Sequence, residues 1–210
     1  NETINAVMPL PEDEDAWDKL NIMFATASGN IRRNLLSDFQ RVQSNGKIAM
    51  KLEDDDSLIG IRVCDENQHV FLASHSGRAL RTNVTNVRVF KGRNSVGVRG
   101  MKLDKKDKLI SMSILNGEEI SMEARSEFLR IPVDIRMEIA KEETADRVAE
   151  LIKDVELEGG LSHDDIHKLA QGEEFILTIT ENGYGKRTSA YEYRITGRGG
   201  KGIVNIVTSE

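Results

Sequence analysis

The order of apolar and polar residues repeats three times along the chain. In each copy an apolar run enters a Ser-Gly or Asn-Gly pair, and a second segment leaves it with an arginine four residues beyond the glycine. Glycine at this place permits the positive φ of a tight hairpin turn, and the flanking runs are rich in β-branched residues. The pattern therefore predicts β-hairpins, which turn at Gly29, Gly77 and Gly183.

The spacing of these turns indicates the architecture. The first two glycines are 48 residues apart and the next two are 106 apart, which is one further period plus 58 extra residues. A second β run follows each hairpin, for example at 48–52 and 203–207, and apolar pairs recur at 58–59 and 109–110. A repeat of about 40–50 residues built from four strands is typical of a propeller-like blade. We predict an all-β repeat fold whose blades, 1–115 and 175–210, form one domain.

The extra residues, 116–174, have a different pattern. Apolar residues between Ile139 and Val155 keep helical spacing, with charged pairs on the other face. Ser162 and Asp165 form a capping-box pattern that opens a short helix ending near Gly172. We predict a helical insertion that projects from the blades.

The net charge of −6 conceals a division between these parts. Residues 117–174 contain 17 acidic and 7 basic residues, whereas the rest of the chain contains 18 acidic and 22 basic residues. A mildly basic body thus carries an acidic insertion. The insertion either weakens nucleic-acid binding by the body or is a passive excursion into solvent.

Several features indicate whether the chain belongs to a longer protein and where in the cell it is located. Both ends fall inside the repeat pattern, so we expect a fragment of a longer array. Cys64 is the only cysteine, which excludes an internal disulfide and fits a reducing compartment. No apolar run approaches the roughly 20 residues that cross a membrane, and no secretory leader opens the chain. The expected location is the cytoplasm.

The basic residues are the strongest candidates for binding. Many fall at corresponding turns of successive repeats, and equivalent positions of a radial array lie on one rim. A rim of lysine and arginine binds phosphate backbones and releases counterions, whereas for any single residue a solvated turn is an equal alternative. The candidate DNA-binding residues are Arg32, Arg33, Lys47, Arg78, Arg81, Lys91, Arg93, Arg99, Lys186, Arg187, Arg198 and Lys201.

Other chemistry has weaker support. His163 and His167 have the spacing of a zinc pair, but no third ligand is evident and an exposed helix face is favoured. A solvated turn is likewise favoured over a cation site for the acidic run at 54–56. No catalytic constellation, metal site or nucleotide-binding loop is predicted.

Three segments resemble a known family. The stretches 96–103 (Val-Gly-Val-Arg-Gly-Met-Lys-Leu), 181–188 (Glu-Asn-Gly-Tyr-Gly-Lys-Arg-Thr) and 48–52 (Ile-Ala-Met-Lys-Leu) look like blades of the C-terminal domain of the DNA gyrase A subunit. The resemblance implies a β-pinwheel whose basic perimeter wraps DNA and supports ATP-dependent negative supercoiling. It implies three partners: double-stranded DNA bound through phosphates, the rest of the gyrase A subunit, and the gyrase B subunit. ATP and magnesium would be used elsewhere in the holoenzyme, so no cofactor is implied for this chain.

One departure keeps two alternatives open. The family's gyrase box reads Gln-Arg-Arg-Gly-Gly-Lys-Gly, and only Arg-Gly-Gly-Lys-Gly is present here, at 198–202. A topoisomerase IV-type C-terminal domain is one alternative. A propeller-like protein-interaction module without a nucleic-acid role is the other, and it predicts mixed or apolar rims rather than basic residues that converge.

Overall fold

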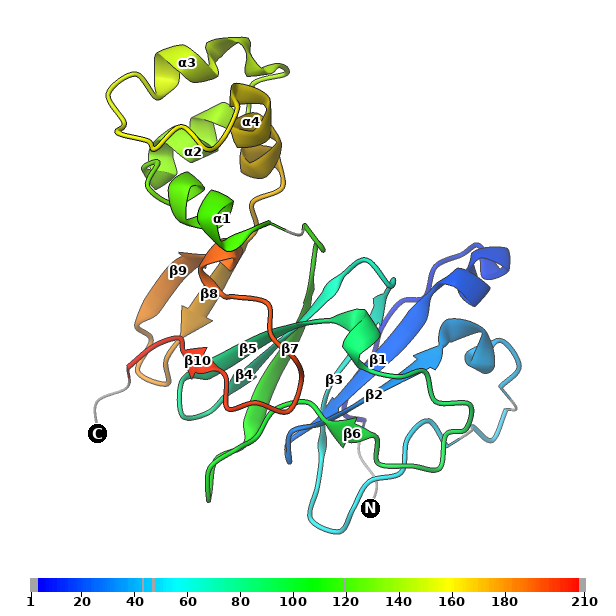
Figure 1. Cartoon of the computed structure of the whole chain (residues 1–210). Helices are drawn as coiled ribbons and strands as arrows, with labels where there is room; N and C mark the ends of the chain where they lie inside the picture. The colour runs from blue at the N-terminus through cyan, green and yellow to red at the C-terminus, as the bar shows by residue number, and fades with distance from the viewer. Residues whose placement is uncertain (1–3, 43, 47, 119, 208–210) are drawn as a thin grey trace. The chain divides into compact units, whose positions relative to one another are not determined.

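The computed structural model describes residues 4–42, 44–46, 48–118 and 120–207 (Figure 1). The chain forms two compact units. The first contains Asn1–Gly117 with Tyr193–Glu210, and the second is Glu118–Glu192.

Two tight β-hairpins form the centre of the first unit. Strand β1 (Asn21–Thr26) pairs antiparallel with β2 (Asn30–Leu35), and β4 (His69–Ser74) pairs in the same way with β5 (Arg78–Asn83). The turn glycines have φ of +89° at Gly29 and +80° at Gly77, the left-handed region that glycine enters without steric cost. The predicted hairpins of the first two repeats are confirmed.

Each hairpin becomes a four-stranded sheet by adding one strand from its own repeat and one from the next. Strands β3 (Leu58–Cys64) and β7 (Leu109–Leu115) pair with β1 and β4. The outer partner of β2 is β6 (Val98–Arg99), and that of β5 is β10 (Ile203–Val204). The strand orders are β3-β1-β2-β6 and β10-β5-β4-β7.

The incoming strands approach so closely that the residue just before each of them must be glycine. Gly97 and Gly202 have φ of +89° and +69°. A Cβ atom at either position would lie 2.3 Å from a backbone oxygen, that of Ile31 or Ala79 respectively. Each glycine-rich stretch is therefore held at the edge of the preceding repeat's sheet.

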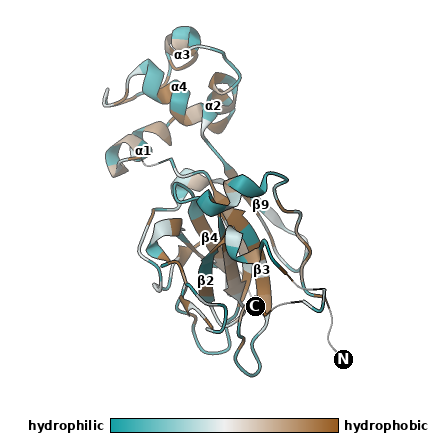
Figure 2. Cartoon of the chain, turned by 90° about the vertical axis from the view of Figure 1, so that its right-hand side faces the viewer, coloured by the Kyte–Doolittle hydropathy of each residue, from teal (hydrophilic) through white to brown (hydrophobic). Residues whose placement is uncertain are grey.

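An aliphatic core lies between the two sheets of this unit. Met23, Ala25 and Ile31 from one sheet pack with Leu72 and Met112 from the other, and all five are almost fully buried. Figure 2 shows hydrophobic residues along the strands and hydrophilic residues in many connecting loops. Cys64 belongs to this core, and burial raises the pKa of its thiol to about 12. The thiol is therefore protonated at neutral pH, as expected of a packing residue rather than a nucleophile.

A carboxylate secures each hairpin turn of this unit. Asp56 accepts hydrogen bonds from the backbone N–H and hydroxyl of Ser28, at 2.9 and 2.7 Å. Asp107 accepts the same pair of bonds from Ser76, at 3.0 and 2.7 Å. Burial opposes ionisation of both carboxyls, but these hydrogen bonds outweigh burial and hold the pKa of each aspartate below its usual value.

The second unit combines four helices with the third hairpin. Its elements are α1 (Met122–Phe128), α2 (Val133–Ile139), α3 (Val148–Leu151), α4 (His163–Gln171), β8 (Phe175–Ile179) and β9 (Gly185–Ser189). The helices, together with Tyr191 after β9, share a core of their own, which includes Phe128, Ile139 and Ile166. A buried ion pair joins Arg136 to Glu173 at 3.0 Å.

Local signals in the insertion were predicted with mixed success. Both hydrogen bonds of the Ser162–Asp165 capping box are present, and α4 ends at Gly172. The expected continuous helical pattern between Ile139 and Val155 is instead interrupted after α2, because a 3-10 turn (Ala145–Arg147) precedes the short α3.

Other expectations need correction. Residues 48–52 form no strand, since no strand edge among the described residues pairs with them. The body also contains the 3-10 helices η1 (Glu14–Lys19), η2 (Leu36–Phe39) and η3 (Val84–Asn86), and a further one, η5 (Ala190–Glu192), follows β9.

The third repeat is divided between the units. β8 and β9 group with the helices, whereas residues 193–207 group with the first two repeats. That all of 175–210 forms one domain with 1–115 stays a prediction. No helix within the described ranges is long and apolar enough to cross a membrane.

We predict that replacing Asp107 by asparagine destabilises the first unit at neutral pH and destabilises it progressively less as the pH falls below about 3.9. The folded-state pKa of Asp107 is depressed. The ionised carboxylate therefore stabilises the folded state above the unfolded-state pKa of about 3.9. This stabilisation is lost as the pH falls through the lower folded-state pKa. Losing charge-assisted bonds should cost about 1 kcal/mol at pH 7. Urea unfolding from pH 7 to pH 3 measures this, with the exposed Asp54→Asn as control. An equal loss at both pH values would contradict the prediction.

Candidate nucleic-acid interface

The second glycine-rich loop, 197–202, rests against the end of β6. The backbone N–H of Gly199 donates to the Gly100 oxygen at 2.6 Å, and the Lys102 N–H donates to the Gly200 oxygen at 2.8 Å. These bonds join residues from two repeats. They bring the basic side chains that flank the two segments into one neighbourhood.

This neighbourhood contains five basic residues, which we call the basic cluster: Arg78, Arg99, Lys102, Arg198 and Lys201. Arg78 donates to the backbone oxygens of Lys201 and Gly202, both at 2.9 Å. Arg99 is exposed on β6, and a Cβ on Gly199 would lie 3.9 Å from its Cδ atom. Four members were predicted from the sequence, and the structure brings those four together.

Arg198 and Lys201 already have partners within the chain. Arg198 donates to the backbone oxygens of Asn86 and Arg99 at 3.0 and 3.2 Å. The Lys201 ammonium lies 2.6 Å from the Asp104 carboxylate, and this bond lowers the pKa of Asp104. The pair is half-exposed in solvent, where salt screens it and its net stabilisation is small.

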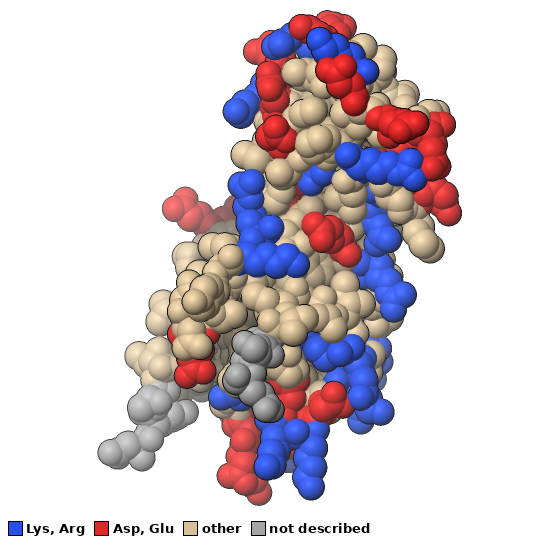
Figure 3. Space-filling model, turned by 90° about the vertical axis from the view of Figure 1, so that its left-hand side faces the viewer, with Lys and Arg blue, Asp and Glu red and all other residues tan. Residues whose placement is uncertain are grey.

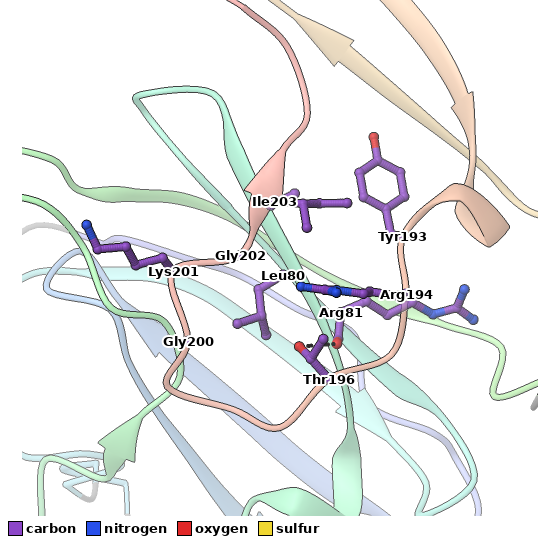
Figure 4. Close-up of a pocket in the computed structure, with 10 residues that line it drawn as sticks. Leu80, Arg81, Tyr193, Arg194, Thr196, Gly200, Lys201, Gly202 and Ile203 are labelled. Carbon is purple, nitrogen blue, oxygen red and sulfur yellow. Dashed lines mark hydrogen bonds between the residues drawn. The ribbon is translucent and has the colours of Figure 1, made fainter. Parts of the chain in front are cut away.

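A small cavity lies beneath the same loop. It has a volume of about 150 Å³ and is lined by residues including Leu80, Tyr193, Thr196 and Gly200. The Thr196 hydroxyl faces the Arg81 backbone oxygen, whereas the Lys201 side chain points away from the cavity (Figure 4). Although Lys201 is one of the residues that line the cavity, its ammonium group faces away from it, toward Asp104.

The first glycine-rich loop, 91–100, carries a second basic site. Lys91 is exposed, and Arg93 is half-buried with its guanidinium over the Phe39 ring at 6.0 Å. The nearby Arg88, which the sequence pattern did not single out, is exposed and lies 4.3 Å from the Phe90 ring centroid. Lysine and arginine side chains adjoin one another in places on the face drawn in Figure 3, with acidic side chains among them.

Arg32 is not on the rim, and this corrects the sequence-based interpretation. Its side chain is fully buried. It donates to the backbone oxygens of Gly92, Arg93 and Ser95 in the first glycine-rich loop. Burial lowers the pKa of this guanidinium and Arg93 lowers it further, although arginine remains protonated in proteins. The residue supports the loop from inside.

Arg33 and Arg81 are also buried, which corrects the expectation of exposed rim residues. Arg33 pairs with Glu66 at 3.2 Å. Arg81 donates to Nδ1 of His69 at 3.1 Å and to the Asn116 backbone oxygen at 3.2 Å. The arginine four residues past each turn glycine thus anchors the first two hairpins within the fold.

The remaining predicted residues lie elsewhere. Lys186 and Arg187 are exposed on β9 in the second unit. There the Arg187 guanidinium lies over the Phe175 ring at 4.7 Å and donates to the Met137 sulfur at 3.4 Å. Lys47 lies outside the described residues.

Lys102 is the member of the basic cluster that the sequence pattern did not include. The sequence did contain a feature that could have identified Lys102: it lies three residues after Arg99, in the stretch that follows the first glycine-rich loop. Recurrence between repeats pointed instead to Arg33 and Arg81, which are buried. A contact with phosphate by any of these residues stays a prediction.

Metal chemistry has no support in the described part of the chain. No group of three histidine, cysteine, aspartate or glutamate side chains there could hold a metal ion. His167, one half of the suspected pair, has its Nε2 atom 2.9 Å from the Glu142 backbone oxygen.

We predict that Arg32→Leu destabilises the first unit by about 3 kcal/mol, because several buried carbonyls lose a charged donor. Leucine is the residue at the equivalent place in the second hairpin, Leu80. Arg99→Ala, at an exposed position, should change stability by less than about 0.5 kcal/mol. Urea unfolding compares the two. Wild-type stability of Arg32→Leu would show that the buried guanidinium is dispensable to the fold.

Comparison with known proteins agrees with this architecture. A family model described as the DNA gyrase C-terminal domain, a β-propeller, matches residues 20–65, 68–116 and 174–210. The DNA gyrase A subunit of Rickettsia prowazekii (strain Madrid E) is 53% identical over 206 residues, which are 98% of this chain and 22% of that protein. The corresponding protein of Salmonella typhimurium (strain LT2) is 31% identical over 210 residues, 100% of this chain and 17% of that protein. The chain therefore spans about one fifth of the length of these relatives.

A solved structure supports the fold alone. The crystal structure of the C-terminal domain of DNA topoisomerase IV is similar with a TM-score of 0.58 at 18% identity, over 89% of this chain and 41% of that one. Because the family model spans most of the chain in three segments that coincide with the three repeats, the chain belongs to the family of the DNA gyrase C-terminal domain.

Proposed function

We propose that this chain binds double-stranded DNA through its phosphates, as part of the DNA-wrapping module of a gyrase A subunit. The observation that carries the proposal is the basic cluster, in which loops of two repeats join and expose adjacent cations. Family membership and the relatives named as gyrase subunits support it. The topoisomerase IV-type alternative rests only on similarity of fold.

The chemistry of the cluster suits a backbone-binding site. Arginine and lysine neutralise phosphates without reading bases, and exposed glycine backbone allows close approach. The cations flank the end of β6 and the loop 197–202, and the segments 96–104 and 197–204 contain no aromatic residue on which a base could stack. We therefore expect sequence-tolerant binding dominated by the charge of the backbone.

The wider role belongs to the same proposal. Wrapping would support negative supercoiling by a holoenzyme that contains the B subunit together with the rest of the A subunit, with ATP and magnesium used outside this chain. A cytoplasmic location follows for an enzyme that acts on bacterial DNA. This chain would supply no catalytic group.

The direct test is the salt dependence of binding to a short DNA duplex, with Arg99→Ala as the variant. Losing one phosphate contact should reduce the slope of log affinity against log salt by about 0.9. The control is Lys19→Ala, which removes an exposed charge from η1, outside the basic cluster. Fluorescence anisotropy measures both. Equal slopes for the two variants, or a sharp preference for one short sequence, would contradict the proposal.

We also propose that the second unit weakens this binding by electrostatic repulsion. Residues 118–192 contain 19 acidic and 9 basic residues, a balance of −10, whereas the remainder of the chain has a balance of +4. Negative charge near a phosphate-binding surface raises the free energy of association, and salt screens the effect over about 8–10 Å.

The corresponding experiment replaces 118–192 with a glycine-serine linker. The unit boundaries favour this segment over the helices alone, because Tyr191 shares the core of the helices. We expect tighter DNA binding at low salt, by up to about tenfold, and a smaller gain at moderate salt. A variant that unfolds with wild-type cooperativity and binds with unchanged affinity at both salt concentrations would refute the repulsion.

A further inference from the structure

Two Gly-Arg pairs recur at matching places in the glycine-rich loops, at 92–93 and 197–198. We propose that Arg93 and Arg198 are inter-repeat staples, which tie each basic loop to the repeat before it. They are then positioning residues for the DNA-binding surface rather than phosphate contacts. The functional half of this inference rests on the proposed function.

An equivalent side-chain-to-backbone hydrogen bond is present in both repeats, although the donor atom differs. Arg93 donates through Nη1 to the backbone oxygen of Asp38 at 3.2 Å. Arg198 donates through Nε to the backbone oxygen of Asn86 at 3.0 Å. Asp38 and Asn86 are equivalent, since each lies nine residues past the turn glycine of its repeat, Gly29 or Gly77.

Both acceptors lie in a 3-10 turn that follows the hairpin. Asp38 is in η2 and Asn86 ends η3, where the backbone leaves the second strand of each hairpin. Carbonyls of such short turns lack the full set of helical partners, so an incoming guanidinium satisfies them. The staple therefore uses an acceptor that each repeat provides at the same place.

Arg198 has a second anchor that fixes the loop in two directions. Its Nη1 atom donates to the backbone oxygen of Arg99 at 3.2 Å. One side chain thus bridges the turn after β5 and the end of β6. Next to it, the Gly199 N–H donates to Gly100 and the Lys102 N–H donates to Gly200, which completes the junction.

The loop at 92–93 is held from the opposite side as well. The buried Arg32 donates to the backbone oxygens of Gly92 and Arg93, while Arg93 itself reaches out to Asp38. In the other loop Arg78 donates to the oxygens of Lys201 and Gly202. Each loop is therefore secured by one arginine of its own and one from the preceding hairpin.

This arrangement separates two roles among the cations. Arg198 is itself exposed, but two of its donors, Nε and Nη1, lie on backbone carbonyls. Arg99 and Lys102 are exposed beside it on the segment that it holds. Arginine is required for the staple because its planar fork donates in two fixed directions, which a single ammonium cannot reproduce. A phosphate contact tolerates lysine, because the contact depends mainly on the charge.

The experiment compares Arg198→Lys with the matched control Arg62→Lys in the whole chain, so that charge is preserved at both positions; Arg62 is exposed on β3, outside the basic cluster. We expect Arg198→Lys to accelerate amide hydrogen exchange at Gly199 and Lys102 by about tenfold or more, because the junction opens locally. Its affinity for a DNA duplex should fall about fivefold with an unchanged salt slope, since no charge is lost. Arg62→Lys should leave amide exchange at Gly199 and Lys102 unchanged and the affinity within about twofold, because Arg62 lies outside the basic cluster.

A urea-unfolding measurement accompanies each variant, so that a global loss of stability is distinguished from local opening. The inference fails if amide exchange in Arg198→Lys equals that of the wild type. It also fails if Arg198→Lys binds DNA like the wild type while Arg198→Ala reduces the salt slope by about 0.9, because Arg198 would then be a direct phosphate contact. If the wild-type chain does not bind DNA, the proposed function fails, and hydrogen exchange still decides whether the staple exists.

Discussion

The exchange of edge strands between successive repeats is the constraint on which the first unit depends. Neither four-stranded sheet is complete within its own repeat, because β6 and β10 come from the repeat that follows. The crossing is possible only because Gly97 and Gly202 lack a Cβ atom where the strands meet the Ile31 and Ala79 oxygens. Folding of one repeat is thereby coupled to its neighbour, as in other arrays stabilised at the interfaces between repeats. The exchange of edge strands also explains why the glycine-rich stretches, with their basic neighbours, lie at sheet edges.

Arginine has two distinct uses in this framework. Burying a cation is costly unless fixed partners replace its water. Arg32 meets this condition with loop carbonyls, Arg33 with Glu66, and Arg81 with His69 and a backbone oxygen. These residues organise the loops and hairpins, whereas the exposed members of the basic cluster are available to a ligand. A chain rich in arginine can therefore have a much smaller basic surface than its composition suggests.

The second unit has a hydrophobic core of its own. Its helices share one apolar core, to which Tyr191 adds, and the ion pair between Arg136 and Glu173 is buried. Such a unit can carry a strongly acidic surface without disturbing the sheets of the first unit. The insertion thus adds charge to the chain at a place where the repeat pattern has a gap.

The sequence alone determined the local elements and the repeat. Gly29 and Gly77 identified the hairpin turns, Ser162 and Asp165 identified the cap of α4, and the interval between glycines located the insertion. These signals succeed because turns and caps are governed by residues that are neighbours in the chain. The division of charge was equally visible, and so was the resemblance to the gyrase family.

Only the tertiary structure decided which lysine and arginine side chains face solvent. Arg33 and Arg81 recur in register, but the register reflects a shared place in the fold, where residues distant in sequence cover the side chain. The two-residue strands β6 and β10 have no periodicity to detect, because non-local pairing defines them. The joining of Arg99 and Lys102 with Arg198 likewise required the contact between repeats about one hundred residues apart. Burial and partnership are properties of the packed chain, and a pattern of residue types along one strand does not contain them.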